Sequence, residues 1–340
     1  MDVLNTPSRP PPEAGVARYS LSVVVPVCNE EAVLVEFHRR LTAVLDGLAA
    51  DSEVVYVNDG SRDGTMALLR HIHASDTRVA VIDLSRNFGK EVAMSAGLDV
   101  AGGDAVIVID ADLQDPPEHI PDMIAAWRGG SDVVLMRRRT RRDESWLKKT
   151  TANLFYRAMG RIGSIEIPAN VGDFRLLSRR AVEALRRLPE RTRFLKGLFV
   201  WIGFPTTEIE YDRPGRHAGT TKWNYWRLWN FALEGITSFS VLPLKLASYI
   251  GLLTALLAFG YGVKVIVWTM LYGDPVRGYP TLIVVVLFLG GLQLMALGVI
   301  GEYVARMFIE VKQRPLYLIQ GRLPAARPIV ADRHHDRLPR

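Results

Sequence analysis

The sequence predicts an α/β protein with a mostly parallel sheet, followed by amphipathic helices and two membrane-spanning helices. Two observations support this prediction. Short apolar runs alternate with amphipathic stretches between residues 21 and 136, and two long apolar stretches follow at 246–271 and 281–300. Alternating strand-like and helix-like segments are typical of a parallel sheet that helices cover on both faces.

The elements of this α/β part follow one another closely. We expect strands at 21–27, 53–57, 79–84, 105–109 and 132–135, with helices between them at 31–48, 63–74, 90–101 and 118–128. Open sheets of this kind bind ligands at the carboxyl ends of their strands. The polar residues that follow each strand are therefore the first candidates for chemistry.

The two apolar stretches are long enough to cross a membrane. About 20 apolar residues in a helix match the thickness of the hydrocarbon core of a bilayer. The alternative is a pair of helices buried in a soluble protein, but a short segment with Gly273, Pro275, Gly278 and Pro280 joins the stretches and indicates a hairpin. Lys264 is the only charged residue in either stretch, and it either snorkels to the headgroups or faces the bundle interior.

Basic residues flank the predicted hairpin on its two outer sides. The turn between the spans holds only Arg277, beside Asp274. By the positive-inside rule, both chain ends and the large N-terminal part are cytoplasmic, at the plasma membrane. The flanking residues are Arg213, Arg216, Lys222, Arg227 and Lys245 before the first span, and Arg306, Lys312 and Arg314 after the second.

Composition excludes several classes of protein. The 340 residues are 49% hydrophobic and 23% charged, which excludes global disorder. The net charge of +6 comes with arginines beside apolar segments, which suits a lipid bilayer better than nucleic acid. The single cysteine, Cys28, excludes an intramolecular disulfide and a four-cysteine zinc site.

Segments 146–162 and 223–239 interleave aromatic and basic residues, as interfacial helices do, although ordinary packed helices are the alternative.

A pair of acidic residues follows the strand at 105–109. The segment reads Asp110-Ala111-Asp112-Leu113-Gln114-Asp115-Pro116. Two carboxylates this close repel unless a cation or hydrogen bonds compensate them. Mg²⁺ and Mn²⁺ prefer oxygen ligands and are commonly shared with substrate phosphates. A solvated turn or helix cap is the alternative, but the position after a buried strand favours a metal site.

Two further strand ends carry polar residues. The first strand closes with Pro26-Val27-Cys28-Asn29-Glu30-Glu31 and the second with Asn58-Asp59-Gly60-Ser61. Asp59 is a candidate acceptor for a nucleobase N–H or a ribose hydroxyl, with an Asx turn at Gly60 as the alternative. Cys28 is either a nucleophile or a passive pocket residue, and the absence of a nearby histidine in the sequence favours the latter.

These motifs together resemble glycosyltransferase family 2. The resemblance rests on segments 24–31, 58–65, 110–116 and Arg86-Asn87-Phe88-Gly89-Lys90, and it extends over about 21–320. With the two spans, the chain is similar to the polyprenyl-phosphate hexosyltransferases, which include dolichol-phosphate mannose synthase and the GtrB-type bactoprenol glucosyltransferases. One departure is Cys28, where many members carry tyrosine.

The resemblance implies a GT-A fold, a nucleotide-sugar donor and a divalent cation, Mg²⁺ or Mn²⁺. It implies that the cation and the donor diphosphate are held by Asp110, Asp112 and Gln114. The residues expected around the nucleotide sugar are Pro26, Asn29, Glu31, Asp59, Lys90, Asp110, Ala111, Asp112 and Gln114. A divalent cation at this position would stabilise the charge that develops on the leaving diphosphate.

The segment 170–177 resembles the acceptor side of the family's site. Asp173 is a candidate for orienting or activating the acceptor and Arg175 for pairing a phosphate, so the catalytic candidates are Asp112, Asp173 and Arg175. The alternative is an ion pair between Asp173 and Arg175 in a structural turn. Because a phosphate acceptor is already ionised, Asp173 need not act as a strong base. Positive charge near the lipid and donor phosphates is expected from Arg137, Arg138, Arg216 and Lys222.

The expected activity is transfer of one hexose from a nucleotide sugar to polyprenyl (undecaprenyl or decaprenyl) phosphate, with inversion, to supply cell-envelope glycan modification. UDP-glucose is the favoured donor, and GDP-mannose, UDP-GlcNAc and UDP-galactose are alternatives. Two other hypotheses are a processive transferase, although the usual Gln-x-x-Arg-Trp motif is missing, and a non-catalytic membrane module such as a flippase partner. The resemblance also suggests a homo-oligomer, with a tetramer as the candidate.

These expectations divide the chain into six parts. They are a disordered tail (1–18), a cytosolic catalytic domain (19–215), an active-site loop with a juxtamembrane helix (216–245), two transmembrane helices (246–300), a cytosolic juxtamembrane segment (301–320) and a disordered basic tail (321–340).

Overall fold

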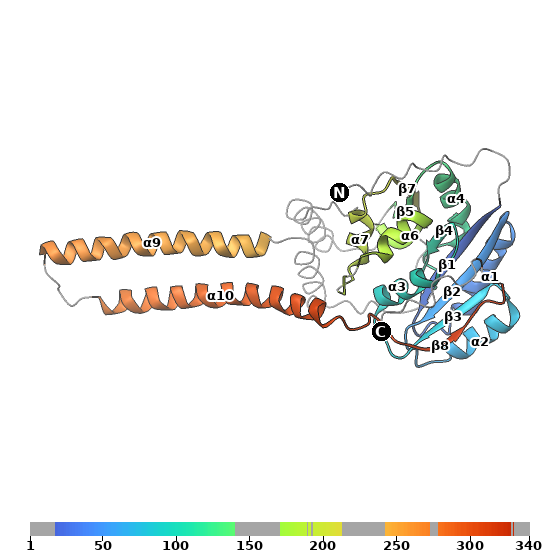
Figure 1. Cartoon of the computed structure of the whole chain (residues 1–340), viewed down its shortest axis with the longest axis horizontal. Coiled ribbons are helices and arrows are strands. Elements are labelled where there is room, and N and C mark those ends of the chain that lie inside the picture. The colour runs from blue at the N-terminus through green and yellow to red at the C-terminus, as the bar shows by residue number, and fades with distance from the viewer. Residues whose placement is uncertain are drawn as a thin grey trace. The chain divides into compact units, whose positions relative to one another are not determined.

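The computed structural model describes residues 18–139, 171–188, 190–191, 193–212, 242–272, 278–327 and 329 (Figure 1). They form two compact units. The first comprises the described residues up to 212 together with those from 315 onward, and the second comprises the described residues of 242–314. The tail 1–17, the segments 146–162 and 223–239, and the side chains Arg216 and Lys222 lie outside the described residues, so the predictions for them stay predictions.

The first unit is built on an eight-stranded sheet with the order β7-β5-β6-β4-β1-β2-β3-β8. Strands β6 and β8 run antiparallel to their neighbours, and the other neighbouring strands are parallel. The predicted α/β class with a mostly parallel sheet is confirmed. The strands are β1 (Tyr19–Val27), β2 (Ala50–Asn58), β3 (Val79–Leu84), β4 (Ala105–Val108), β5 (Val133–Arg138), β6 (Val171–Ser178), β7 (Thr206–Tyr211) and β8 (Ile319–Leu323).

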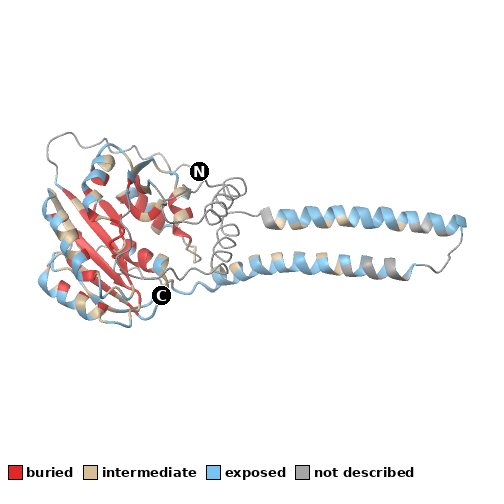
Figure 2. Ribbon diagram, turned by 180° about the vertical axis from the view of Figure 1, so that it is seen from behind, coloured by how far each residue is buried: buried red, intermediate tan, exposed pale blue. Residues whose placement is uncertain are grey.

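Helices cover both faces of this sheet, and its strands form the buried centre of the unit (Figure 2). On one face, Val23 and Val25 of β1 share an apolar cluster with residues of α1, α2 and α4. Val24 points to the other face, against α3. The helices of this unit are α1 (Leu34–Asp46), α2 (Thr65–Ser75), α3 (Lys90–Val100), the 3-10 helix η1 (Pro117–His119), α4 (Ile120–Arg128), α6 (Arg179–Arg186) and α7 (Leu195–Trp201).

Helix α3 approaches the sheet closely at a glycine. A Cβ atom at Gly97 would lie 2.3 Å from Cγ1 of Val24 and 3.1 Å from Cγ2 of Val57. Only a residue without a side chain permits this approach. The packing matters for function because α3 begins at Lys90, one of the predicted site residues.

The strands and helices predicted between residues 21 and 136 are all present, with small shifts at their ends. The sequence pattern did not predict β6, β7 or β8. Strand β8 corrects one predicted boundary, because a disordered tail was expected from residue 321. Instead, Ile319–Leu323 pairs antiparallel with β3, and Tyr317 donates a hydrogen bond of 2.9 Å to Asp99.

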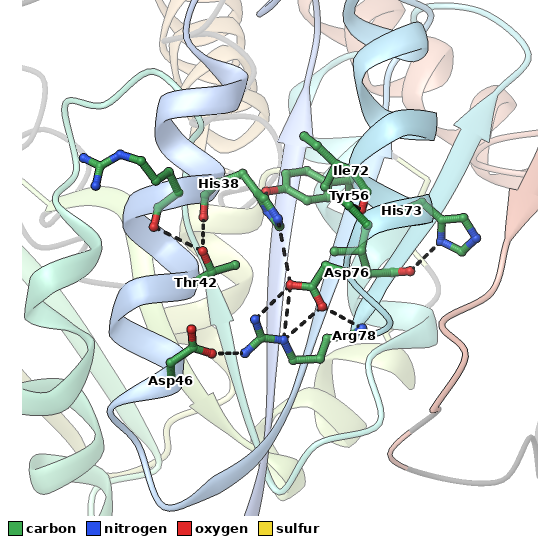
Figure 3. Close-up of polar contacts among 11 residues, drawn as sticks. His38, Thr42, Asp46, Tyr56, Ile72, His73, Asp76 and Arg78 are labelled. Carbon is green, nitrogen blue, oxygen red and sulfur yellow. Dashed lines mark hydrogen bonds and ion pairs between the residues drawn. The ribbon is translucent and has the colours of Figure 1, made fainter.

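A polar cluster connects α1, β2 and the segment between α2 and β3 (Figure 3). His38 Nδ1 lies 3.0 Å from the hydroxyl of the fully buried Tyr56, and its Nε2 lies 3.8 Å from Asp76. Arg78 connects Asp76 and Asp46 at 2.8 and 2.6 Å. Burial lowers the pKa of His38, which outweighs the opposing effect of Asp76. The cluster ties α1 and the end of α2 to the sheet.

The second unit contains two long helices, α9 (Leu242–Tyr272) and α10 (Tyr279–Lys312), which run side by side in opposite directions (Figure 1). Each is long and apolar enough to cross a membrane, over Leu244–Lys264 and Phe288–Lys312. Neither of these segments is buried within the structure, and their apolar side chains are largely exposed (Figure 2). Lys264 forms no ion pair with another described residue.

Candidate active site

The predicted site residues that lie in the described part of the chain gather at one edge of the sheet. Strands β1, β2 and β4 end there, and the antiparallel β6 begins there, since Arg175 lies opposite Val108 of β4. From β1 the chain moves to β2 and β3 on one side, whereas β4 lies on the other side. A reversal of strand order of this kind leaves a crevice at the carboxyl ends of the strands, where α/β proteins bind their ligands.

A lysine at the start of α3 joins two acidic residues at this edge. Lys90 Nζ donates a hydrogen bond of 2.6 Å to Asp110 Oδ2, and it also donates to Oδ2 of Asp173. The other oxygen of Asp173, Oδ1, lies 3.9 Å from Nζ of Lys196 in α7. Asp110, Lys90, Asp173 and Lys196 therefore form a row of alternating charges, which we call the charge row.

The electrostatics of the charge row favour the ionised forms of its two central members, Lys90 and Asp173. Burial alone would lower the pKa of Lys90, but Asp110 and Asp173 raise it above its ordinary value. Burial alone would raise the pKa of Asp173, but Lys90, Lys196 and Arg175 hold it below its ordinary value. An aspartate with a lowered pKa is a weak general base. Of the two roles considered for Asp173, this favours positioning over activation.

Glu30 is an acidic neighbour that the sequence analysis did not select. Burial, followed by the charges of Asp112, Asp110 and Asp63, raises its pKa to about 7, although Lys90 opposes this. The part of this shift that comes from Asp112, Asp110 and Asp63 shows that several carboxylates lie close together here. A divalent cation bound at this edge would reduce the repulsion between them.

The acidic pair and Gln114 fit a cation that substrate also ligates. Asp112 accepts a hydrogen bond of 3.1 Å from the backbone N–H of Gln114, whose side chain is buried. Among the described residues, no three His, Cys, Asp or Glu side chains are arranged as a complete metal cluster. Mg²⁺ needs no such cluster, because it is commonly held by one or two carboxylates together with phosphates and waters. The donor set and the close carboxylates around Glu30 both suit such a cation.

Asp59 organises a neighbouring loop. Its two oxygens accept hydrogen bonds from the backbone N–H groups of Phe88 and Gly89, at 2.7 and 3.0 Å. Gly60, with φ +64°, packs against the backbone of Arg86 so closely that a Cβ would lie 2.5 Å away. Asp59 therefore fixes the loop that leads into Lys90. A nucleoside would donate its hydrogen bonds to the remaining lone pairs of these two oxygens.

The loop after β1 is held by the loop after β2. Asn29 has φ +58°, and its side-chain oxygen accepts a hydrogen bond of 2.8 Å from the N–H of Arg62. Glu31 accepts a hydrogen bond of 2.9 Å from the N–H of Gly64. Asn29 and Glu31, both predicted to contact the nucleotide, thus lie at the carboxyl ends of the strands, and their side chains hold the loop after β2 in place.

The remaining donor-side residues also lie on these loops and strand ends. Pro26 is buried near the end of β1, opposite Val57, and Ala111 is buried between the two aspartates. Cys28 accepts a hydrogen bond of 3.2 Å from the side-chain amide of Asn87. Burial raises the pKa of the Cys28 thiol, which disfavours the nucleophilic thiolate and supports the interpretation as a passive pocket residue.

Arg175 does not pair with the carboxylate of Asp173, and its side chain is buried. Its guanidinium donates to the carbonyl oxygens of Gly172 and Asp173, at 2.8 and 3.3 Å, and lies 3.9 Å from the ring centroid of Phe199. Burial lowers its pKa to about 10. Arg175 thus supports the backbone that carries Asp173, and this position gives no support to the expected phosphate contact.

The arginines after β5 differ in their surroundings. Arg137 pairs with Glu208 at 3.0 Å, so part of its charge is already neutralised. Arg138 lies beside Tyr211, whose hydroxyl donates a hydrogen bond to Asp115 at the end of the acidic segment. The contact between Tyr211 and Asp115 joins β7 to the predicted metal loop. The sequence analysis missed it, because β7 itself was not predicted.

Two site residues escaped the sequence analysis for different reasons. Glu30 stands beside Glu31 in the quoted motif, so only the fold shows which of the two faces the acidic pair. Lys196 stands in a mainly apolar segment (Phe194-Leu195-Lys196-Gly197-Leu198-Phe199), where a single lysine interrupts an otherwise buried pattern. That interruption is the one signal that marks it.

Family models match both units of the chain. The model described as glycosyl transferase family 2 matches residues 22–186, and the model described as the GtrB C-terminal hairpin matches residues 242–307. The second match contains α9 and most of α10. A hairpin of this family, together with the two apolar helices, makes this a membrane-associated protein.

Several curated proteins are similar over nearly their whole length. An uncharacterised glycosyltransferase of Synechocystis is 52% identical over 299 residues, which cover 88% of this chain and 94% of the relative. The SfII prophage-derived bactoprenol glucosyl transferase of Shigella flexneri is 49% identical over 300 residues, with 88% and 97% covered. A prophage bactoprenol glucosyl transferase homolog of Escherichia coli is 48% identical, with 88% and 98% covered.

Solved structures offer a more distant likeness. Glucosyl-3-phosphoglycerate synthase from Mycobacterium tuberculosis, solved with Mn²⁺, UDP and phosphoglyceric acid, is 19% identical to this chain. The match covers 64% of this chain and 76% of the synthase, with a TM-score of 0.45. A likeness at this level transfers none of that protein's ligands or residues to the present chain.

Proposed function

The chain belongs to glycosyl transferase family 2, and from this premise we propose that it moves a single glucose from UDP-glucose to polyprenyl phosphate, with inversion at the anomeric carbon. The observation that carries the proposal is the 49% identity to a bactoprenol glucosyl transferase over 97% of that protein's length. The matched length includes both the sheet that carries the candidate active site and the hairpin. A transferase that joins a soluble donor to a lipid acceptor needs both parts.

The donor end of the proposed site is the acidic pair. Asp110, Asp112 and Gln114 would hold Mg²⁺ or Mn²⁺, which when bound would neutralise charge on the departing diphosphate. Lys90 contributes positive charge at the same place, because its ammonium already contacts Asp110. Asn29, Glu31 and Asp59 would bind the nucleoside through the lone pairs that their loop contacts leave available.

The transfer is a direct displacement. An oxygen of the acceptor phosphate forms a bond to the anomeric carbon, from the face opposite the leaving group. The bond between that carbon and the β-phosphate oxygen breaks, and its electron pair departs with UDP. Because the acceptor phosphate is already ionised near neutral pH, no proton has to be removed from it. This agrees with the lowered pKa of Asp173, which suits a residue that positions charged groups.

The hairpin would keep the enzyme at the bilayer that holds its acceptor. By the positive-inside rule, the charges that flank the spans support a cytoplasmic position for the catalytic unit and both termini, with the acceptor in the inner leaflet of the plasma membrane. Within this arrangement we keep the domain boundaries proposed above, except that the catalytic unit also includes β8. Assembly into an oligomer, with a tetramer as the candidate, stays a prediction.

The proposal is tested by the lipid products of the purified protein in detergent. It is incubated with undecaprenyl phosphate, Mg²⁺ and UDP-glucose, and in parallel with UDP-galactose, UDP-GlcNAc and GDP-mannose, and the lipid extracts are analysed by mass spectrometry. We expect a single hexose on the lipid, formed fastest from UDP-glucose. Chains of several sugars would indicate a processive enzyme, and no lipid-linked sugar from any donor would indicate a non-catalytic module.

A further inference from the structure

A lysine outside the donor end of the site is the starting point. Lys196, the second residue of α7, is the last member of the charge row and lies 3.9 Å from Asp173. This distance is an ion-pair contact and exceeds that of a hydrogen bond. Among the residues that the structure describes, the ammonium of Lys196 has no hydrogen-bond partner, although it can donate three hydrogen bonds.

The backbone that carries Lys196 is fixed on two sides. The N–H of Leu195 donates a hydrogen bond of 2.8 Å to Glu91, the residue after Lys90, which attaches the start of α7 to α3. Further along α7, the ring of Phe199 lies under the guanidinium of Arg175 in β6. These contacts fix the backbone of α7 on both sides of Lys196 and do not depend on the Lys196 side chain.

The surroundings of Lys196 favour an anion. Only 32% of its side chain is exposed, so the ammonium has lost part of its hydration. Burial lowers its pKa, and the nearby charges of Arg175 and Lys90 add to this effect, whereas Asp173 opposes it. A partly dehydrated cation without hydrogen bonds gains strongly from a ligand that supplies charged oxygen atoms.

The order of residues in the charge row indicates which anion Lys196 would bind. Lys90 connects Asp173 to Asp110, the residue assigned to the donor diphosphate and its cation. Lys196 contacts Asp173 on its other oxygen and, among the described residues, forms no ion pair with Asp110. In a displacement, the attacking oxygen and the leaving oxygen lie on opposite sides of the reacting carbon. A phosphate bound at the Lys196 end would therefore stand across Asp173 from the leaving group.

We propose that Lys196 binds the phosphate of the acceptor, with Asp173 as the positioning residue that holds Lys196 and Lys90 on its two oxygens. This inference rests on the proposed function, because it assigns the second substrate of that reaction. It gives the site two separate lysines, of which Lys90 serves the departing diphosphate and Lys196 serves the attacking phosphate.

The test is the steady-state kinetics of Lys196→Met, which removes the charge but keeps the length of the side chain. We expect the KM for undecaprenyl phosphate to rise about 10-fold or more, as loss of a charge-assisted contact predicts, while the KM for UDP-glucose stays within about 2-fold. Lys196→Arg should restore most of the acceptor affinity. Arg39→Met, at an exposed ion pair with Glu36, is the matched control and should leave both constants unchanged.

Four outcomes separate the possibilities. An unchanged acceptor KM in a folded, active Lys196→Met protein overturns the assignment of Lys196. A rise only in the KM for UDP-glucose also overturns it, because the lysine would then serve the donor. If the Lys196→Met protein is too unstable to assay, the neutral but polar Lys196→Gln variant replaces it. An inhibition constant for short-chain isoprenyl phosphate that is equal in the wild-type and Lys196→Gln proteins then overturns the assignment. A wild-type protein that forms no lipid-linked sugar refutes the proposed function itself.

Discussion

We expect Lys90 to offset the charge of Asp110 when no cation is bound there, and its removal should show this. Its ammonium contacts both Asp110 and Asp173, whose side chains are 19% and 16% exposed. Lys90→Met removes the positive charge and leaves two largely buried carboxylates beside each other. We therefore expect the metal-free variant to be less stable than the wild type, and Mg²⁺ to stabilise the variant more than it stabilises the wild type.

The size of the effect follows from the exposure of the partners. Breaking a fully buried ion pair costs about 3–5 kcal/mol, whereas a fully exposed pair contributes about 0.2–1 kcal/mol. Because the Lys90 side chain is 42% exposed, solvent screens part of the interaction, and we expect a loss of about 1–3 kcal/mol. For a domain of this size, the loss lowers Tm by roughly 2–12 °C.

The assay is thermal unfolding in detergent, followed by tryptophan fluorescence, with EDTA and with a Mg²⁺ titration. In the wild type the cation must compete with Lys90 for Asp110, whereas in Lys90→Met it has no competitor. The Mg²⁺-dependent rise in Tm should therefore be larger and should begin at a lower concentration in the variant. Arg39→Met, which removes an exposed charge that pairs with Glu36 on α1, should leave both the Tm in EDTA and the response to Mg²⁺ unchanged.

Two results would refute this reasoning. One is a Tm of Lys90→Met in EDTA that equals that of the wild type, since the carboxylates would then need no compensation. The other is a Mg²⁺ response that is identical in the two proteins, because the cation would then bind away from the charge row.

Three further predictions concern the acidic pair, the polar cluster and the packing of α3. Asp112→Ala should abolish transfer while leaving Tm in EDTA within a few degrees of the wild type; residual transfer above about 1% would remove Asp112 from the site. Burial lowers the pKa of His38 below its usual 6.5, so its contribution to stability is complete above that pH. The contribution is lost as the pH falls from there toward the pKa of the folded protein, with a slope of at most about 1.4 kcal/mol per pH unit. His38→Gln should flatten the dependence of Tm on pH between 7 and 5, and an unchanged slope would contradict this. Gly97→Ala should cost about 1–3 kcal/mol because of the 2.3 Å approach to Val24, whereas Gly47→Ala, whose Cβ would make only an ordinary 3.4 Å contact, is the control for urea unfolding.

The early strands could be predicted because each is a local signal. Runs such as Val79–Leu84 and Ala105–Val108 are apolar almost throughout, as strands buried on both faces are, and the acidic segment directly follows one of them. The sequence therefore predicts that residues 110–112 lie at the carboxyl ends of the strands. The spans were equally readable, since their signal is apolar length alone.

The rest of the site depends on pairings between distant segments, which no local pattern encodes. Strand β6 inserts between β4 and β5, although it follows both in the chain, and only this insertion brings Asp173 to Lys90. In the same way, Arg175 was expected at a phosphate, but β6 buries its side chain over Phe199. Charge type and order are visible in the sequence, whereas the choice among possible partners is made by the topology of the sheet.

Binding of Mn²⁺ in the presence of UDP tests the central claim most directly, because it reports on the acidic edge without requiring an acceptor. In a titration followed by electron paramagnetic resonance, the wild type should bind one equivalent of Mn²⁺, more tightly with UDP than without it. Asp112→Ala should lose this UDP-dependent binding. If Asp112→Ala binds Mn²⁺ and UDP as tightly as the wild type does, the carboxylates at the end of β4 do not hold the donor, and the account is wrong.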